Sequence, residues 1–256
     1  MKHMDIRSLL AFWLLLLVLG APLRAQVTPT PLARMNIDVP DFEPYQAEYT
    51  SAFGRFLHEA WPYALDGRPK VGVVNTIVTP EGVIVDSRSF DRGTLHIDYM
   101  TSPYFAWGQE YVVALFQGSQ HQWTRVPLGG GEPVVLRATS EDGPLVDDLG
   151  FSPAFASLLP LEVGTSFSMP VPRPLADGTV GSALMTFEVV GTEHLSLASG
   201  YACDCTVLEQ KGPGESVTRF WVSREAPFVF RRHRDVGGQR DFVSDLLGFQ
   251  GFDLGR

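Results

Sequence analysis

Residues 95–126, LHIDYMTSPYFAWGQEYVVALFQGSQHQWTRV, decide the fold class of this chain. The first part, Leu95–Tyr99, alternates apolar with polar side chains, which is the period-two pattern of a half-buried strand. A continuous apolar run over 111–116 follows, and after a glycine-containing turn comes a further strand-like segment over 120–126, which contains Trp123. Short runs that end at Gly, Pro or Asp are typical of strands joined by tight turns. The stretch therefore predicts an antiparallel meander.

The same pattern continues on both sides of this stretch, without the regular strand–helix–strand alternation of a parallel sheet. We predict an all-β fold in which two successive sets of antiparallel strands, with a short helix between them, form one curved sheet and an incomplete barrel. The predicted strands lie at residues 71–78, 83–85, 95–100, 111–116, 120–126, 134–137, 166–171, 181–190, 201–209, 216–222 and 228–234.

Two short helices are expected outside these strands. The apolar residues within 53–61 recur at helical spacing, so an amphipathic helix is predicted inside 45–63. Ser152 followed by Pro153 is a favourable helix start, because serine caps the first turn and proline is tolerated there. A second helix is therefore predicted over 151–159, between the two sets of strands.

Residues 1–25 have the order of a secretory signal. Lys2 and Arg7 give a basic start, an uncharged apolar run covers 9–19, and Ala25 supplies a small residue at the cut. The run is shorter than the roughly 20 residues that a helix needs to cross a bilayer. An uncleaved anchor is the alternative, and we predict a periplasmic or secreted protein after cleavage near Ala25.

The rest of the chain is predicted as an extended arm over 26–43, rich in Pro and Thr, and a single domain over 44–256. The formal charge of −9 becomes −11 without the leader, whose own net charge is +2. Such an excess repels phosphate backbones and anionic lipid heads. We therefore predict no nucleic-acid partner; the predicted partners are a lipid or other apolar small molecule and a peripheral contact with the envelope.

No motif in the sequence indicates a common hydrolase, nucleotide site or metalloprotease. The acidic pairs Glu141-Asp142 and Asp147-Asp148 lie in a loop and are interpreted as solvated. No two histidines beyond the leader lie within four residues of each other, so we interpret them as surface or rim residues. We predict no metal, no cofactor and no enzymatic activity. These histidines are His58, His96, His121, His194 and His233.

Aromatic residues gather in two groups, and on the concave face of a curved sheet they could hold a lipid-like ligand. The same side chains would equally fill a solid core, and that alternative stays open. The cluster 231–234, Arg-Arg-His-Arg, could clamp an anionic head, but alternation along a strand splits it between two faces. The candidate ligand-binding residues are Tyr104, Phe105, Trp107, Trp221, Phe228, Phe230 and Arg232.

The stretch 201–209, YACDCTVLE, contains both cysteines of the chain. In a strand Cys203 and Cys205 share one face with Tyr201 and Val207. Residues two apart in a strand are about 6.6 Å apart, near the upper limit for a disulfide. We predict core-facing thiols; a redox or metal site and an internal bridge are the alternatives.

The last third of the chain resembles a known family. Residues 158–164, LLPLEVG, match its leucine–proline–leucine–glycine element, and 200–207 match the strand that follows. Residues 220–222, FWV, and 227–231, PFVFR, match its ending. In this order the elements are similar to the cell-envelope family called domain of unknown function 3108.

This resemblance implies export in bacteria of the Gram-negative type. It also implies an incomplete barrel similar to lipoprotein carriers (LolA-like) or lipocalins, with an apolar hollow for acyl chains. It supplies no catalytic residues, and relatives commonly have an aromatic residue at the position of Cys205. Three functions remain open: a carrier of a lipidic ligand, a structural or interaction protein with a solid core, and a thiol-dependent enzyme.

Overall fold

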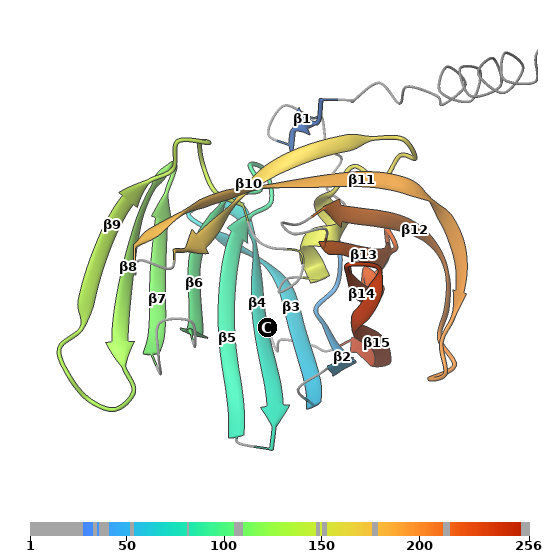
Figure 1. The fold of residues 1–256 in the computed structure, drawn as a ribbon, viewed down its shortest axis with the longest axis horizontal. Coiled ribbons are helices and arrows are strands. Elements are labelled where there is room, and N and C mark those ends of the chain that lie inside the picture. The colour runs from blue at the N-terminus through green and yellow to red at the C-terminus, as the bar shows by residue number, and fades with distance from the viewer. Residues whose placement is uncertain are drawn as a thin grey trace, which may run out of the picture.

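The computed structural model describes residues 28–32, 35, 41–51, 54–80, 82–104, 110–146, 149, 153–175, 179–211 and 216–251 (Figure 1). The predicted leader and part of the predicted arm lie outside these residues. The strands are β1 Thr30–Pro31, β2 Tyr45–Ser51, β3 Gly54–Leu65, β4 Arg68–Thr79, β5 Gly82–Asp91, β6 Ile97–Tyr104, β7 Glu110–Gln117, β8 Gln120–Pro127, β9 Val134–Thr139, β10 Ser166–Pro174, β11 Val180–Ser196, β12 Ala202–Lys211, β13 Ser216–Val222, β14 Val229–Val236 and β15 Gln239–Gly251.

All these strands form one curved, open sheet in the order β1-β10-β11-β12-β13-β14-β15-β2-β3-β4-β5-β6-β7-β8-β9 (Figure 1). Neighbouring strands are antiparallel, except that β1 pairs with β10 in parallel. The all-β prediction and the two successive strand sets are thus confirmed. Short β-runs separated by turn residues can be recognised from the sequence alone, because each hairpin is a local feature.

The two strand sets, β2–β9 and β10–β15, join where the last strand pairs with β2. Tyr45 lies opposite Gly251, and Tyr49 lies opposite Leu246. The hydroxyl of Tyr49 donates to the Val229 carbonyl at 2.9 Å. Strands from opposite ends of the described chain therefore form the centre of the sheet.

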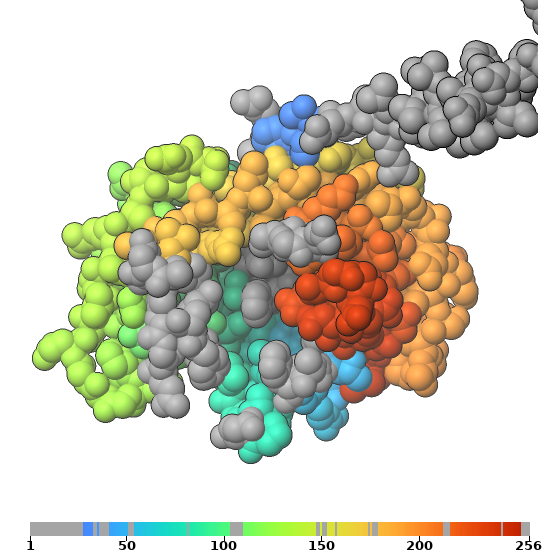
Figure 2. All heavy atoms as spheres, viewed as in Figure 1, coloured from blue at the N-terminus to red at the C-terminus, as the bar shows by residue number. Residues whose placement is uncertain are grey.

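Strands β10 and β11 run across the upper ends of the other strands (Figure 1). In the space-filling view they form a gold-to-orange band that lies above the red lobe of β14–β15 and extends to the lime wing of β7–β9 (Figure 2). Where this band reaches the wing, Ser182 Oγ donates to Asp142 Oδ2 at 2.8 Å, and Val180 is buried against the wing's small core. The band therefore covers one side of the β6–β9 wing.

The helix predicted inside 45–63 is wrong, because this segment forms most of β2 and β3. Buried residues in β2 follow a period of two through Tyr45, Ala47 and Tyr49. In β3, Trp61 lies across from Gly72 of β4, where an added Cβ would come within 2.5 Å of the indole ring. The described apolar residues at that spacing, Phe56, Leu57 and Trp61, all belong to β3, where alternation places Phe56 on one face and Leu57 and Trp61 on the other. The helical spacing was therefore coincidental.

The helix predicted over 151–159 is present as a 3-10 helix over Pro153–Leu158. It lies inside the curve of the sheet (Figure 1), and the Phe155 ring meets the Phe90 ring edge to face at 5.4 Å. The predicted arm contributes strand β1, and Leu32 beside it is buried in the core. Helix and arm thus both help to fill the concave side of the sheet.

The described residues form two hydrophobic clusters that stabilise the fold. The larger one fills the space between the two strand sets and includes the most deeply buried aromatic rings. The smaller one lies on the β6–β9 wing around Trp123. The most deeply buried rings of the first cluster are Tyr45, Phe90, Phe155, Phe167, Phe187, Phe220 and Phe228.

Among the described residues, no helix combines the length and apolar character that crossing a membrane would require.

Candidate functional site

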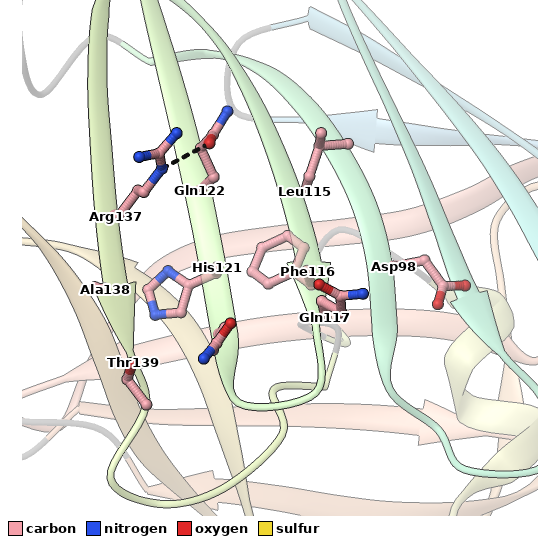
Figure 3. A pocket seen from close by; sticks show the side chains of 10 residues that line it. Asp98, Leu115, Phe116, Gln117, His121, Gln122, Arg137, Ala138 and Thr139 are labelled. Carbon is pink, nitrogen blue, oxygen red and sulfur yellow. Dashed lines mark hydrogen bonds between the residues drawn. The ribbon is translucent and has the colours of Figure 1, made fainter.

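A hollow of about 700 Å³ lies at the ends of β7, β8 and β9. Pairing between these strands aligns its lining in three rows (Figure 3). The middle row runs through Phe116, His121 and Ala138. Successive rows of a sheet face opposite sides, so the middle row shares its side with Trp123 and the small core. The two flanking rows are Leu115, Gln122 and Arg137, and Gln117, Gln120 and Thr139.

His121 is the central polar residue of this hollow and is 4% exposed. Its Nδ1 atom receives a hydrogen bond from the Trp123 indole N–H at 2.7 Å. Its ring stacks on Phe116 with centroids 5.9 Å apart. Its Nε2 atom is buried and has no hydrogen-bond partner among the described residues. Burial lowers the pKa of His121, so the ring is neutral at neutral pH.

A second polar cluster is buried on strands β2–β5. The Tyr45 hydroxyl lies 3.2 Å from His58 Nε2, and His58 Nδ1 lies 2.7 Å from Asn75 Oδ1. The Asn75 amide donates to Asp86 Oδ1 at 2.6 Å, and Arg88 Nη2 lies 3.5 Å from Asp86 Oδ2. We call these five residues the buried polar row. Burial lowers the pKa of His58 to about 4, so this ring is also neutral at neutral pH.

The donor and the acceptor can be assigned for each hydrogen bond between Tyr45, His58, Asn75 and Asp86 in the buried polar row. An ionised Asp86 can only accept, so the Asn75 amide must donate to it and its Oδ1 must accept from His58 Nδ1–H. His58 Nε2 then accepts from the Tyr45 hydroxyl. The row lies against the large core and does not line the hollow, so its chemistry is separate from that of His121.

The predicted ligand-binding residues of β13, of β14 and of the turn before β14 lie in or against the large core. Trp221 and Phe228 are buried in it, and Phe230 packs on its edge. The Arg232 guanidinium lies over the Phe220 ring at 5.9 Å. None of these four residues lines the hollow of His121. The three aromatic side chains therefore pack in or against the large core, and Arg232 packs on one of its rings.

The structure places no side chain of the other predicted aromatic group, Tyr104, Phe105 and Trp107. Phe105 and Trp107 lie outside the described residues, and Tyr104 is described for its backbone alone, as the last residue of β6. The predicted split of the basic cluster is present in β14. Arg231 pairs with Asp245 on the face of Trp221, whereas Arg232 lies on the face of Phe220.

The two cysteines form a disulfide, so the prediction of core-facing thiols is wrong. The predicted shared face is right, because Cys205 and Val207 are both buried. The Cα atoms of Cys203 and Cys205 are 5.2 Å apart, closer than in an ideal extended strand and within the range that a disulfide spans. Local contraction of β12 therefore allows a bridge that ideal strand geometry disfavours.

This bridge closes a very short loop, so its contribution to stability should be small. The chain-entropy relation gives about 1–2 kcal/mol for a loop of this size. We expect the double variant Cys203→Ala/Cys205→Ala to lose no more than this free energy of unfolding, measured by urea denaturation of oxidised protein. A loss of several kcal/mol would show that the bridge holds the β11–β12 hairpin in place.

Three of the five histidines contradict the prediction of surface or rim positions. His58, His121 and His233 are buried, while His96 is partly buried and His194 is exposed. His58 and His121 are therefore the residues that sequence reasoning missed. The available signal was period two: His121 shares a face with Trp123, and His58 with Ala60, which are residues of a buried strand face.

The predicted exposure of the acidic pairs can be checked for one pair only. Glu141 and Asp142 are exposed, as predicted, and Asp147 and Asp148 lie outside the described residues. Within the described part of the chain, no group of three or more His, Cys, Asp or Glu side chains is arranged to hold a metal ion.

Comparison with known proteins identifies the chain at the level of family. The family described as "Protein of unknown function (DUF3108)" matches residues 112–244, more than half of the chain. The chain belongs to this family. The DUF3108 match begins in β7 and ends in β15, so it includes the 158–234 region that the sequence resemblance identified. No curated protein and no solved structure matches the chain.

Only one of the two polar sites lies inside the segment that matches DUF3108. His121, Trp123 and the rest of the hollow's β7–β9 lining lie within it. The buried polar row, from Tyr45 to Arg88, lies before it. The hollow is therefore part of the DUF3108 domain, and the row belongs to the strands that extend its sheet.

Proposed function

We propose that this DUF3108 chain is an exported envelope protein that binds a small lipidic or other apolar molecule in the hollow of β7–β9. The observation that carries the proposal is the hollow itself. Its volume of about 700 Å³ is within the roughly 300–1,000 Å³ of small-molecule sites. Its middle row presents an aromatic ring, an imidazole and a methyl group side by side.

The leader-like residues 1–25 support the proposed address in the periplasm or outside the cell. The proposed role is binding rather than catalysis. The thiol-dependent enzyme that the sequence left open would need a reduced cysteine, whereas Cys203 and Cys205 are bonded to each other.

A variant that fills the hollow tests the location. Ala138 lies across from His121 and is partly buried. We expect Ala138→Leu to weaken binding of a fluorescent acyl probe at least about fivefold, since overfilling a packed site typically costs about 1–3 kcal/mol. Ala64→Leu is the matched control, because Ala64 is exposed near the end of β3.

The same purified protein should be extracted and its lipids measured by mass spectrometry. Bound lipid in the wild type and less in Ala138→Leu would support the proposal. If the wild type carries no lipid and binds no acyl probe, the proposed function is wrong.

A structural or interaction protein is the second candidate, and one observation favours it. The space between the two strand sets, where the sequence placed the ligand, is occupied by the large core in the described part of the chain. A protein that binds no acyl probe would then act through its surface. The acyl-probe titration therefore separates the two candidates.

A further inference from the structure

The geometry of His121 points to the chemistry of the ligand. We propose that the ligand carries an uncharged oxygen acceptor, such as the carbonyl oxygen of an ester or amide, that receives a hydrogen bond from His121 Nε2. This inference rests on the proposed function, because it assigns the polar contact within the same hollow.

The first step is the tautomer of His121. The Trp123 indole nitrogen is a donor only, and it lies 2.7 Å from His121 Nδ1. Nδ1 must therefore present its lone pair, and a neutral ring then carries its proton on Nε2. Trp123 acts as a positioning residue that fixes His121 as a hydrogen-bond donor toward its other side.

The second step is the missing acceptor. Nε2 is buried, and no described residue accepts a hydrogen bond from it. Buried donors are nearly always paired, and an unpaired one costs free energy that a ligand acceptor would recover. His121 lines the hollow (Figure 3), so a molecule in the hollow is well placed to supply that acceptor.

The third step is the charge of the acceptor. Among the described lining residues Arg137 is the cation, but it lies in the row that faces the opposite side and its Nε donates to Gln122 at 3.0 Å. Asp98 also lines the hollow, and its carboxylate is bound to Lys70 at 2.7 Å. A carboxylate buried beside His121 would therefore lack a cation, which is costly. An uncharged carbonyl has no such cost.

The fourth step is the body of the ligand. The Phe116 ring stacks on His121, and Ala138 lies on its other side (Figure 3). These groups would contact the carbons next to the carbonyl. Gln117 and Gln120 are exposed at the ends of their strands, in the row that faces the opposite side, so they do not cover Nε2. Because Nε2 is covered, ligand entry requires a local shift of the side chains on the His121 side.

The test compares three probes with the same apolar chain: methyl laurate, laurate and dodecane. Each displaces a fluorescent acyl probe from the purified protein at neutral pH. We expect methyl laurate to bind about tenfold more tightly than laurate or dodecane. His121→Phe keeps a ring but removes the donor, and should weaken methyl laurate about three- to tenfold while leaving dodecane unchanged. His194→Phe is the control, since His194 is exposed.

The outcomes separate this inference from the proposed function. If none of the three probes binds, the proposed function itself fails. If laurate binds as tightly as methyl laurate, or if His121→Phe leaves methyl laurate binding unchanged, the hollow binds lipids but the assigned contact is wrong. Should His121→Phe fail to fold, the wild-type comparison of methyl laurate with dodecane still decides, because equal affinities would overturn the hydrogen bond.

Discussion

Replacing Asp86 with alanine is expected to lower the free energy of unfolding by about 3–5 kcal/mol, the usual effect of removing one partner of a buried ion pair. Asp86 and Arg88 are both buried, with a side-chain exposure of 4% each. Asp86 also accepts from the Asn75 amide at 2.6 Å. Its removal would leave a guanidinium and an amide in the interior without this acceptor.

Urea denaturation at neutral pH, followed by tryptophan fluorescence, measures this effect. Asp241→Ala is the matched control, because Asp241 pairs with Arg234 on the surface, and exposed pairs contribute about 0–1 kcal/mol. Equal, small losses for the two variants would mean that the interior around Asp86 is accessible to water. Asp86→Asn should lie between the two, since an amide keeps the shape and one acceptor oxygen.

Acid is expected to destabilise the protein between about pH 6.5 and pH 4 by about 3 kcal/mol through His58 alone, from its pKa of about 4 in the fold and 6.5 as the reference. Desolvation by burial is the main cause of the lowered pKa. In this interval the unfolded chain binds a proton that the folded chain does not. Stability therefore rises with pH through this window and falls as the pH decreases.

The measurement is the free energy of unfolding at a series of pH values from 4 to 7. His58→Gln should flatten the slope, although its stability at neutral pH should be lower because the bonds to Tyr45 and Asn75 change. His194→Gln, at an exposed site, should leave the slope intact. An unchanged slope in His58→Gln would assign the acid sensitivity to other groups.

Other titrating groups also affect how stability changes with pH. Burial lowers the pKa values of His96, His121 and His233, so they add to it with the same sign. The pKa of Asp91 is lowered from 3.8 by its hydrogen bonds to Lys70 and Thr94, which outweigh desolvation. Its contribution is therefore lost only below this window, as the pH falls further.

Part of the candidate site was within reach of the sequence. The strand over 120–126 was predicted, and period two places His121 and Trp123 on one face. The sequence did not show how deeply that face is buried. Histidines are amphipathic, and whether one is buried depends on the elements packed around it, here the small core that contains Phe116, Trp123 and Val180, the first residue of β11.

The predicted ligand residues show that the sequence also did not reveal whether the concave face of the sheet is filled. Trp221, Phe228 and Phe230 were selected because a curved sheet of aromatic side chains can enclose a ligand. In the fold, the 3-10 helix over Pro153–Leu158 and the residue Leu32 beside β1 contribute to the same cluster as these rings. Filling of a concave face depends on segments distant in sequence, so no local pattern distinguishes a filled interior from an empty one.

The sequence by itself determined the all-β class, the two successive strand sets, the shared face of Cys203 and Cys205 and the resemblance to DUF3108, because alternation, turns and motifs are local. The tertiary structure alone decided that β15 pairs with β2, that the strands β2 and β3 replace the predicted helix, that the cysteines are bonded and that His58 and His121 are buried. The disulfide depends on the local contraction of β12. The other features depend on contacts between distant segments, whose free energy overrides local preference.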